Sequence, residues 1–110
     1  MKKFMNMNYK LGEDGKTPIL TEIDDFTGWE QNRTVRKSLI TSPGGDITVS
    51  TVFLMLDHSH ADGPPILFET MIFGGEHDMY QDRYSTWDEA VEGHQVALDL
   101  VQNNLTLENL

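Results

Sequence analysis

Two strongly apolar segments, residues 47–57 and 66–73, constrain the fold of this chain more than any other feature of its sequence. The middle of the first segment, residues 52–56, is apolar at every position, which is typical of a strand that is buried on both faces. A loop that contains one glycine and two prolines, residues 58–65, joins the two segments. The pattern therefore predicts two neighbouring antiparallel strands at the centre of a sheet.

A third strand and an N-terminal hairpin are expected to extend this pair. The β-branched and apolar residues of segment 33–40 favour a strand, and Pro43 and Gly44 suit the two central positions of a type II turn. Weak alternation and turn residues predict a hairpin over residues 1–20, and acidic residues with a capping threonine favour a short helix over residues 21–32.

The last helix has the clearest local signals. Thr86 and Glu89 have the spacing of a capping box, in which each side chain bonds the backbone N–H of the other residue. A single apolar stripe then follows at helical spacing over residues 86–102. Its members are Trp87, Ala90, Val91, His94, Ala97, Leu98 and Val101. Within it, His94 is predicted to be a hydrogen-bonded core residue, and Gly93 is expected to permit close approach of the helix to the sheet.

These elements predict an α+β fold. It consists of an antiparallel sheet of three main strands, extended by the N-terminal hairpin, with one C-terminal amphipathic helix packed on one face. With 110 residues the chain is expected to form a single domain. Its parts are an N-terminal hairpin and short helix (1–32), the antiparallel sheet (33–73) and the helix (86–102).

Composition narrows the classes of function. Because cysteine is absent, the chain has neither disulfides nor thiolate metal ligands. Eighteen acidic and eight basic residues give a net charge of −10, which disfavours direct binding to a nucleic-acid backbone and suits a basic protein partner or a metal cation. No apolar run approaches the ~20 residues of a membrane span, and no signal peptide is recognisable. A cytoplasmic location is expected.

Metal ligands cluster around the loop between the central strands. The candidates are Asp57, His58, His60, Asp62, Glu69, His77 and Asp78, a nitrogen and oxygen set that suits zinc, manganese or iron. In an extended segment His58 and His60 would lie on the same side, as chelation requires. One interpretation is therefore a divalent metal held by Asp57, His58, His60 and His77, and the other is a solvated polar loop.

Glu69 lies inside an apolar strand, where an unpaired carboxylate would be costly. Tight turns would align Arg33, Leu54 and Glu69 across three strands, so we predict that Glu69 is largely buried and paired with Arg33, or with Arg83 as a second choice. A pocket for an anionic small molecule is an alternative use of this region. Its candidate residues are Trp29, Arg33, Glu69, Tyr80, Arg83 and Tyr84.

The same register, with Ile40 opposite Ile47, places eight apolar residues on each face of the sheet. One face would carry Val35, Leu39, Val52, Leu54, Leu56, Leu67, Met71 and Phe73. The other would carry Ile40, Ile47, Val49, Phe53, Met55, Ile66, Phe68 and Ile72. One helix covers one face, and an apolar patch left open marks an interface. A homodimer, or failing that a partner-bound monomer, is predicted.

A series of short motifs runs through the second half of the chain. They are Val49–Leu54, Leu56–His58, Gly63–Pro65, Phe68–Met71, Phe73–Gly75, Arg83–Thr86, Glu89–Ala90 and Gly93–His94. Together they resemble a set of small proteins encoded by bacteriophages and prophages. The resemblance covers residues 47–95, with weaker agreement around Trp29, Glu30 and Arg33. It implies a phage context but no activity, because those proteins are uncharacterised. Residues 59–62 depart from the more glycine-rich loop expected, which weighs against a metal role for His60.

Three functions remain open on the sequence. The first is a small acidic phage-encoded accessory protein that binds a host or phage protein, with inhibition of host defence as one form of this function. The second is a metal-binding protein or metal-dependent enzyme that uses His58, His60, Glu69 and His77. The third is a protein that sequesters a small molecule or nucleotide signal. The lack of a convincing catalytic motif favours the first, non-catalytic function.

Overall fold

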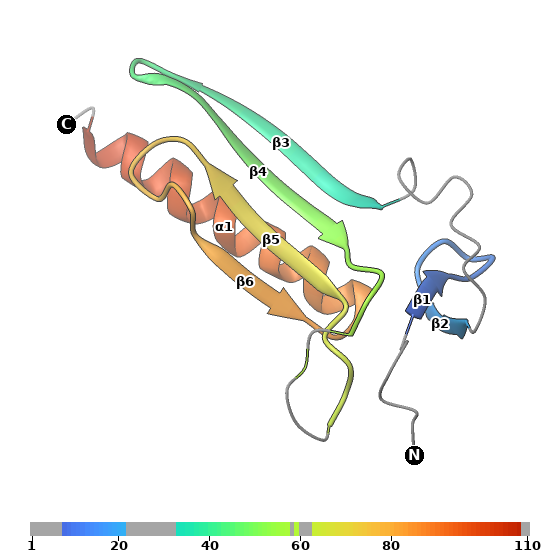
Figure 1. Ribbon diagram of the computed structural model, residues 1–110. Coiled ribbons are helices and arrows are strands. Elements are labelled where there is room, and N and C mark those ends of the chain that lie inside the picture. Colours follow the sequence, from blue (N-terminus) through green and yellow to red (C-terminus); the bar gives the residue numbers. More distant parts are fainter. Residues whose placement is uncertain (1–7, 22–32, 58, 60–62, 109–110) are drawn as a thin grey trace.

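The computed structural model describes residues 8–21, 33–57, 59 and 63–108, and it has an α+β fold. Its elements are β1 (Asn8–Leu11), β2 (Pro18–Thr21), β3 (Thr34–Ser42), β4 (Gly45–Phe53), β5 (Phe68–Phe73), β6 (Gln81–Tyr84) and α1 (Trp87–Glu108). Strands β3, β4, β5 and β6 form one antiparallel sheet in that order, and β1 and β2 form a separate hairpin (Figure 1).

The predicted α+β fold class is correct, but the strands of the main sheet differ from the prediction of three strands extended by the N-terminal hairpin. The main sheet gains β6, which was not among the expected strands, and the hairpin β1–β2 does not join it. An edge strand needs only one hydrogen-bonding neighbour and little apolar content, so β6 has a weak sequence signal. Thr21, the expected cap of the short helix over residues 21–32, is instead the last residue of β2, and the rest of that segment lies outside the described residues.

The register of β3 against β4 is the expected one, with Ile40 opposite Ile47. The turn between them is not the expected type II turn, because Gly45, with a φ of 126°, has the positive φ that this turn type requires at Gly44. A β-bulge at Val35 then shifts the start of β3 by one residue relative to β4. Thr34, the strand residue before the bulge, therefore does not follow the alternation of side chains in the rest of β3.

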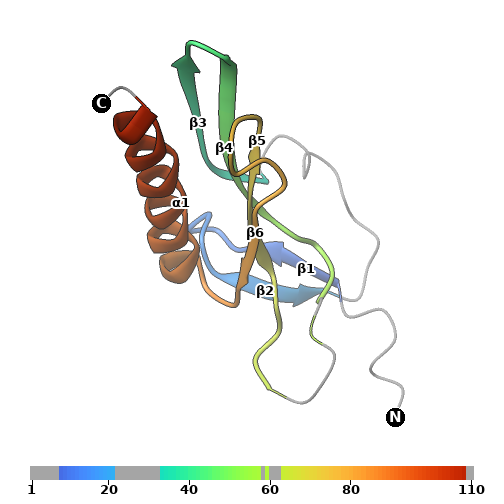
Figure 2. The same cartoon turned by 90° about the vertical axis from the view of Figure 1, so that its left-hand side faces the viewer.

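The core lies between the sheet and α1, which covers one face (Figure 2). On the sheet side, the buried apolar residues are Ile47, Val49, Phe53, Phe68 and Ile72. On the helix side they are Ala90, Ala97 and Val101. These residues include most of the second apolar face expected from the sequence, and the helix residues belong to the expected stripe. The covered face is therefore confirmed.

Helix α1 begins at the predicted capping box. The Glu89 backbone N–H donates to Thr86 Oγ1 at 3.1 Å, and Glu89 Oε1 accepts from the backbone N–H groups of Thr86 at 3.2 Å and Ser85 at 3.1 Å. These bonds satisfy first-turn amides that have no partner within the helix. The helix is longer than expected, because it continues past residue 102 to Glu108.

A chain of buried polar side chains crosses the interface between sheet and helix. His94, 2% exposed, lies with Nε2 2.9 Å from Ser38 Oγ on β3 and Nδ1 2.7 Å from Thr51 Oγ1 on β4. Thr51 Oγ1 lies in turn 2.5 Å from Thr70 Oγ1 on β5. A neutral imidazole has one donor and one acceptor nitrogen, so one hydroxyl donates to the ring and the other accepts from it. The predicted hydrogen-bonded core histidine is confirmed.

Strand β6 packs against α1 through Tyr84. Gly93 packs directly on the Tyr84 ring and hydroxyl, and a Cβ at position 93 would collide with both. The buried Tyr84 hydroxyl has no hydrogen-bond partner in the described part of the chain. Burial is the main effect that raises the pKa of Tyr84, and the Asp82 carboxylate raises it further. The close approach expected at Gly93 is thus confirmed, and its partner is an aromatic ring.

The β1–β2 hairpin lies beyond the end of β4 (Figure 1). The Tyr9 backbone N–H donates to the Met55 carbonyl oxygen at 2.7 Å, and the Tyr9 and Leu11 side chains pack near Phe53. Its turn is held by Asp14, whose carboxylate accepts hydrogen bonds from the Thr17 side chain and two backbone amides. These bonds, the Thr17 hydroxyl first among them, lower the pKa of Asp14 to about 2.

Candidate functional site

The face of the sheet opposite α1 is not covered by any described helix or strand (Figure 2). We call it the open face. Cross-strand pairing orders its side chains into rows. These rows are Leu39–Thr48–Phe73, Lys37–Ser50–Met71–Gln81 and Thr34–Val52–Glu69–Arg83. The row at one end thus carries two large apolar residues, and the row at the other end carries the charged residues Glu69 and Arg83.

The apolar residues of the open face differ in how far they reach into solvent. Leu39 is 65% exposed and Phe73 is 44% exposed, whereas Val52 and Met71 are half-buried among their neighbours. An antiparallel sheet normally carries polar side chains on a face that contacts water. The two large exposed apolar side chains of Leu39 and Phe73, which share one row, depart from this pattern.

This face is smaller than the one expected from the sequence. Leu54 and Leu67, which were assigned to it, are buried, at 8% and 1% exposed. Val35 was assigned to it as well, but the bulge turns this residue toward the core, where it packs beside Phe53. Strict alternation fails at these positions because β4 ends at Phe53 and β3 is interrupted by the bulge.

Glu69 lies on the open face and is paired with Arg83. Its Oε2 accepts from Arg83 Nε at 3.0 Å and from Gln81 Nε2 at 2.6 Å. The Glu69 side chain is 14% exposed and that of Arg83 is 37% exposed. The carboxylate is therefore largely buried and paired, as predicted, although its partner is the second choice.

The first choice, Arg33, was wrong because the central register differs from the expected one by two residues. Val52 lies opposite Glu69, where the sequence analysis placed Leu54. Arg33 instead donates from Nε to the Phe53 carbonyl oxygen at 3.3 Å, and its own carbonyl oxygen accepts from the Phe53 N–H at 2.7 Å. Arg33 thus contacts the end of β4.

The expected anion pocket is divided between the two faces of the sheet. Glu69 and Arg83 lie on the open face, whereas Tyr80 and Tyr84 pack into the core on the covered face. Burial raises the pKa of Tyr80, and the neighbouring Asp82 carboxylate adds to this effect. Trp29 lies outside the described residues. The structure therefore does not bring Arg83 together with the two tyrosines.

The expected metal ligands are only partly described. Asp57 Oδ1 accepts from the backbone N–H groups of Ser59 at 2.8 Å and Ile66 at 2.9 Å, so Asp57 holds the loop closed. His77 is half-buried in the β5–β6 turn, at the other end of β5. Within the described ranges, no group of three or more histidine, aspartate or glutamate residues has metal-binding geometry. His58 and His60 lie outside them.

The β5–β6 turn contains a feature that the sequence analysis missed. Met79 has a φ of 72°, which makes it the only non-glycine residue with positive φ in the described part of the chain. The Met79 N–H donates to the Ile72 carbonyl oxygen at 2.8 Å, and the Ile72 N–H donates to the Tyr80 carbonyl oxygen at 3.1 Å. This is the pattern of a β-bulge whose first residue is usually glycine.

Neighbouring residues hold this turn in place. Gly74 and Gly75 have φ values of 97° and 75°, and the Gly74 N–H donates to Asp78 Oδ1 at 2.7 Å. A Cβ on Gly74 would lie 2.7 Å from the Asp46 carbonyl oxygen, so the turn abuts the start of β4. Met79 itself is 63% exposed. No sequence signal marks a methionine for such a backbone conformation.

The open face offers exposed apolar side chains, the Glu69–Arg83 ion pair and the polar side chains of Lys37 and Ser50, all of which suit contact with another macromolecule. No helix in the described part of the chain combines the length and apolar character needed to cross a membrane. A comparison with known proteins found no matching family model, no similar curated protein and no similar solved structure.

Proposed function

We propose that this chain is a non-catalytic, phage-encoded accessory protein that acts by binding a host or phage protein through the open face of its sheet. The observation that carries the proposal is the row Leu39–Thr48–Phe73, in which two large apolar side chains are 65% and 44% exposed. Exposed apolar residues on a sheet face with no covering layer are typical of interaction surfaces. The phage context comes from the resemblance of its motifs alone.

The charge distribution supports a protein partner. The chain carries a net charge of −10, yet the three rows of the open face contain two cations, Lys37 and Arg83, and one carboxylate, Glu69. Much of the negative charge lies elsewhere, including Asp88, Glu89, Glu92 and Asp99 on α1. A protein that binds these three rows therefore has few ionic groups to desolvate.

A pair of matched variants tests this proposal. Leu39→Glu adds a carboxylate to the open face, and Val96→Glu adds one to the outer side of α1, where Val96 is 54% exposed. We expect the wild-type protein and Val96→Glu to capture the same protein from a bacterial lysate, and Leu39→Glu to lose it while keeping its thermal stability. Equal capture by all three proteins would contradict a role for the open face.

Self-association is a competing use of the same face. The homodimer expected from the sequence stays a prediction, and light scattering at micromolar concentration decides it. A mass of two chains that reverts to one chain in Leu39→Glu would assign the face to a second copy.

The two other functions also stay predictions with direct tests. Elemental analysis of the purified protein would detect a metal held by Asp57, His58, His60 and His77. A small-molecule ligand would be detected by mass spectrometry of the denatured protein. Inhibition of host defence, the more specific form of the proposed function, would be supported if the captured protein belonged to a defence system.

A further inference from the structure

Two exposed apolar residues of the open face, Leu39 and Phe73, share the row nearest the β5–β6 turn, and a third, Met79, lies in that turn. Leu39 and Phe73 flank Thr48 in one row, so about two strand spacings, or roughly 10 Å, separate them. Met79, 63% exposed, follows at the turn, where its N–H bonds the carbonyl of Ile72, the residue before Phe73. We call Leu39, Phe73 and Met79 the turn-end patch.

Met79 occupies a backbone position that favours glycine. A positive φ is costly for residues with a Cβ, and a glycine here would remove the cost. The turn enforces this conformation through bonds from Met79 N to Ile72 O and from Gly74 N to Asp78 Oδ1. A large apolar side chain that is both exposed and held in an unfavourable conformation contributes little to folding. Such outliers are found where a contact with another molecule requires them.

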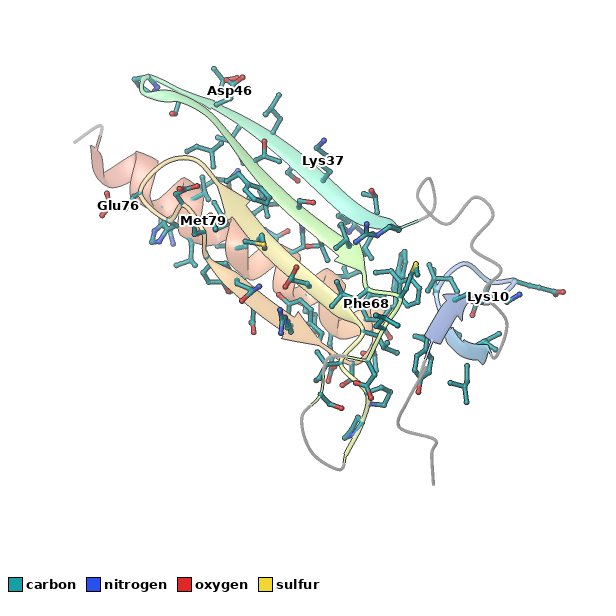
Figure 3. All side chains as sticks on the ribbon, viewed as in Figure 1. Lys10, Lys37, Asp46, Phe68, Glu76 and Met79 are labelled. Carbon is teal, nitrogen blue, oxygen red and sulfur yellow. The ribbon has the colours of Figure 1, made fainter. Side chains whose placement is uncertain are left out.

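Three carboxylates lie at the same end of the sheet as the patch. Asp46 lies at the start of β4, and Glu76 and Asp78 lie in the β5–β6 turn, and all three are exposed. Figure 3 shows Asp46, Glu76 and Met79 at the same end of the molecule, away from the β1–β2 hairpin. Lys37, one row further along the open face, is the nearest cation in the rows described above. We call these three carboxylates the rim of the patch.

We propose that the turn-end patch binds a basic segment of a partner protein, with apolar side chains of the partner seated on Leu39, Phe73 and Met79 and its lysine or arginine residues near Asp46, Glu76 and Asp78. This inference rests on the proposed function and adds the location and the partner's chemistry. A methionine side chain is flexible and polarisable, which suits it to contact with varied apolar surfaces. A second copy of this chain fits the rim less well, because it adds another net charge of −10.

The experiment is an NMR titration of the full ¹⁵N-labelled chain with a synthetic peptide of alternating lysine and leucine. The control peptides alternate glutamate with leucine, and lysine with serine. We expect amide shifts to concentrate at Leu39, Thr48, Phe73 and Met79, with the lysine–leucine peptide binding most tightly. Comparable binding of the lysine–serine peptide, or shifts centred on the acidic outer side of α1, would overturn the proposal.

Met79→Gly is the decisive variant. Because glycine favours the backbone conformation at position 79, thermal stability should not fall, whereas affinity for the lysine–leucine peptide should fall about tenfold. Val96→Ala removes an exposed apolar side chain from α1 and should leave that affinity unchanged. A Met79→Gly protein that is less stable but binds normally would show a purely structural methionine.

Failure of this inference and failure of the proposed function are distinguishable. If Met79→Gly still captures the lysate protein that Leu39→Glu loses, the open face is the binding surface, and the assignment to the turn-end patch is overturned. If the shifts at the patch depend on protein concentration without any peptide, and the mass is that of two chains, a second copy occupies the patch and the basic partner is overturned.

Discussion

His94 Nδ1 on α1 lies 2.7 Å from Thr51 Oγ1 on β4, and both side chains are buried between helix and sheet. This contact joins the helix to the centre of the sheet, while Ser38 on the other side of the imidazole joins it to β3. Because each of these groups would be costly to bury without a partner, the helix is held in one position along the sheet.

Replacement of Thr51 tests the value of that contact. Thr51→Val keeps the shape of the side chain but leaves His94 Nδ1 and the Thr70 hydroxyl without their partner. We expect a loss of about 1–3 kcal/mol in the free energy of unfolding, measured by urea denaturation. Thr48→Val, the matched change on the open face, should be nearly neutral. Equal effects of both variants would contradict the hydrogen-bonded chain.

Stability should fall as the solution is acidified toward the pH range in which histidine titrates. Burial lowers the pKa of His94 below the ordinary value of 6.5, and the nearby Arg36 guanidinium lowers it further. The unfolded chain therefore takes up a proton before the folded chain does. This contribution to stability is fully present above pH 6.5 and is lost as the pH falls through 6.5 toward the lower folded value.

His94→Gln separates this effect from the titration of carboxylates. The variant should be less stable than wild type at about pH 8, and the difference between the two proteins should shrink as the pH falls to about 5. Thermal denaturation across this range is the measurement. A difference that stays constant with pH would mean that His94 does not titrate differently in the folded and unfolded chain.

Gly93→Ala should destabilise the protein, although alanine has a higher helix propensity than glycine. On propensity alone alanine would stabilise a helix interior by about 1 kcal/mol relative to glycine. The new Cβ would instead collide with the ring and hydroxyl of Tyr84, so we expect a net loss of about 1–3 kcal/mol. Adding Tyr84→Phe removes one of the colliding atoms and should recover part of this loss. A more stable Gly93→Ala protein would show that α1 packs differently.

Loss of the cap should weaken the start of α1. Thr86→Ala removes the acceptor of the Glu89 N–H and should cost about 1 kcal/mol. Glu89→Ala removes the reciprocal bond, and the double variant should lose less than the sum of the two, because the bonds support each other. Glu92→Ala, an exposed change on the same helix, serves as the control. Strict additivity would argue against a capping box.

The Glu69–Arg83 pair should contribute little to stability. The Arg83 side chain is 37% exposed, so solvent screens the pair, and Glu69→Gln should change the free energy of unfolding by less than about 1 kcal/mol. The effect should shrink further at high salt. A large and salt-independent loss would indicate that the carboxylate is more deeply buried than the open face allows.

Local sequence determined the elements whose signals need no distant partner. The capping box at Thr86 and Glu89, the apolar stripe of α1 and the presence of β4 and β5 follow from spacing along the chain. The expected apolar centre at residues 52–56 is wrong in its position, because β4 already ends at Phe53. The β3–β4 register also follows from sequence, because a short turn leaves little choice of pairing between Ile40 and Ile47.

Only the tertiary structure decided the rest, because those features depend on pairing between segments that a long loop separates. The loop between β4 and β5 does not constrain their register, so the expected pairing was wrong by two residues, and Glu69 met Arg83 instead of Arg33. Strand β6 has too few apolar residues to be recognised before β5 is there to pair with it. The conformation of Met79 likewise results from its bond to Ile72. Exposure of the open face, and with it the candidate site, depends on which surface the described part of the folded chain leaves uncovered.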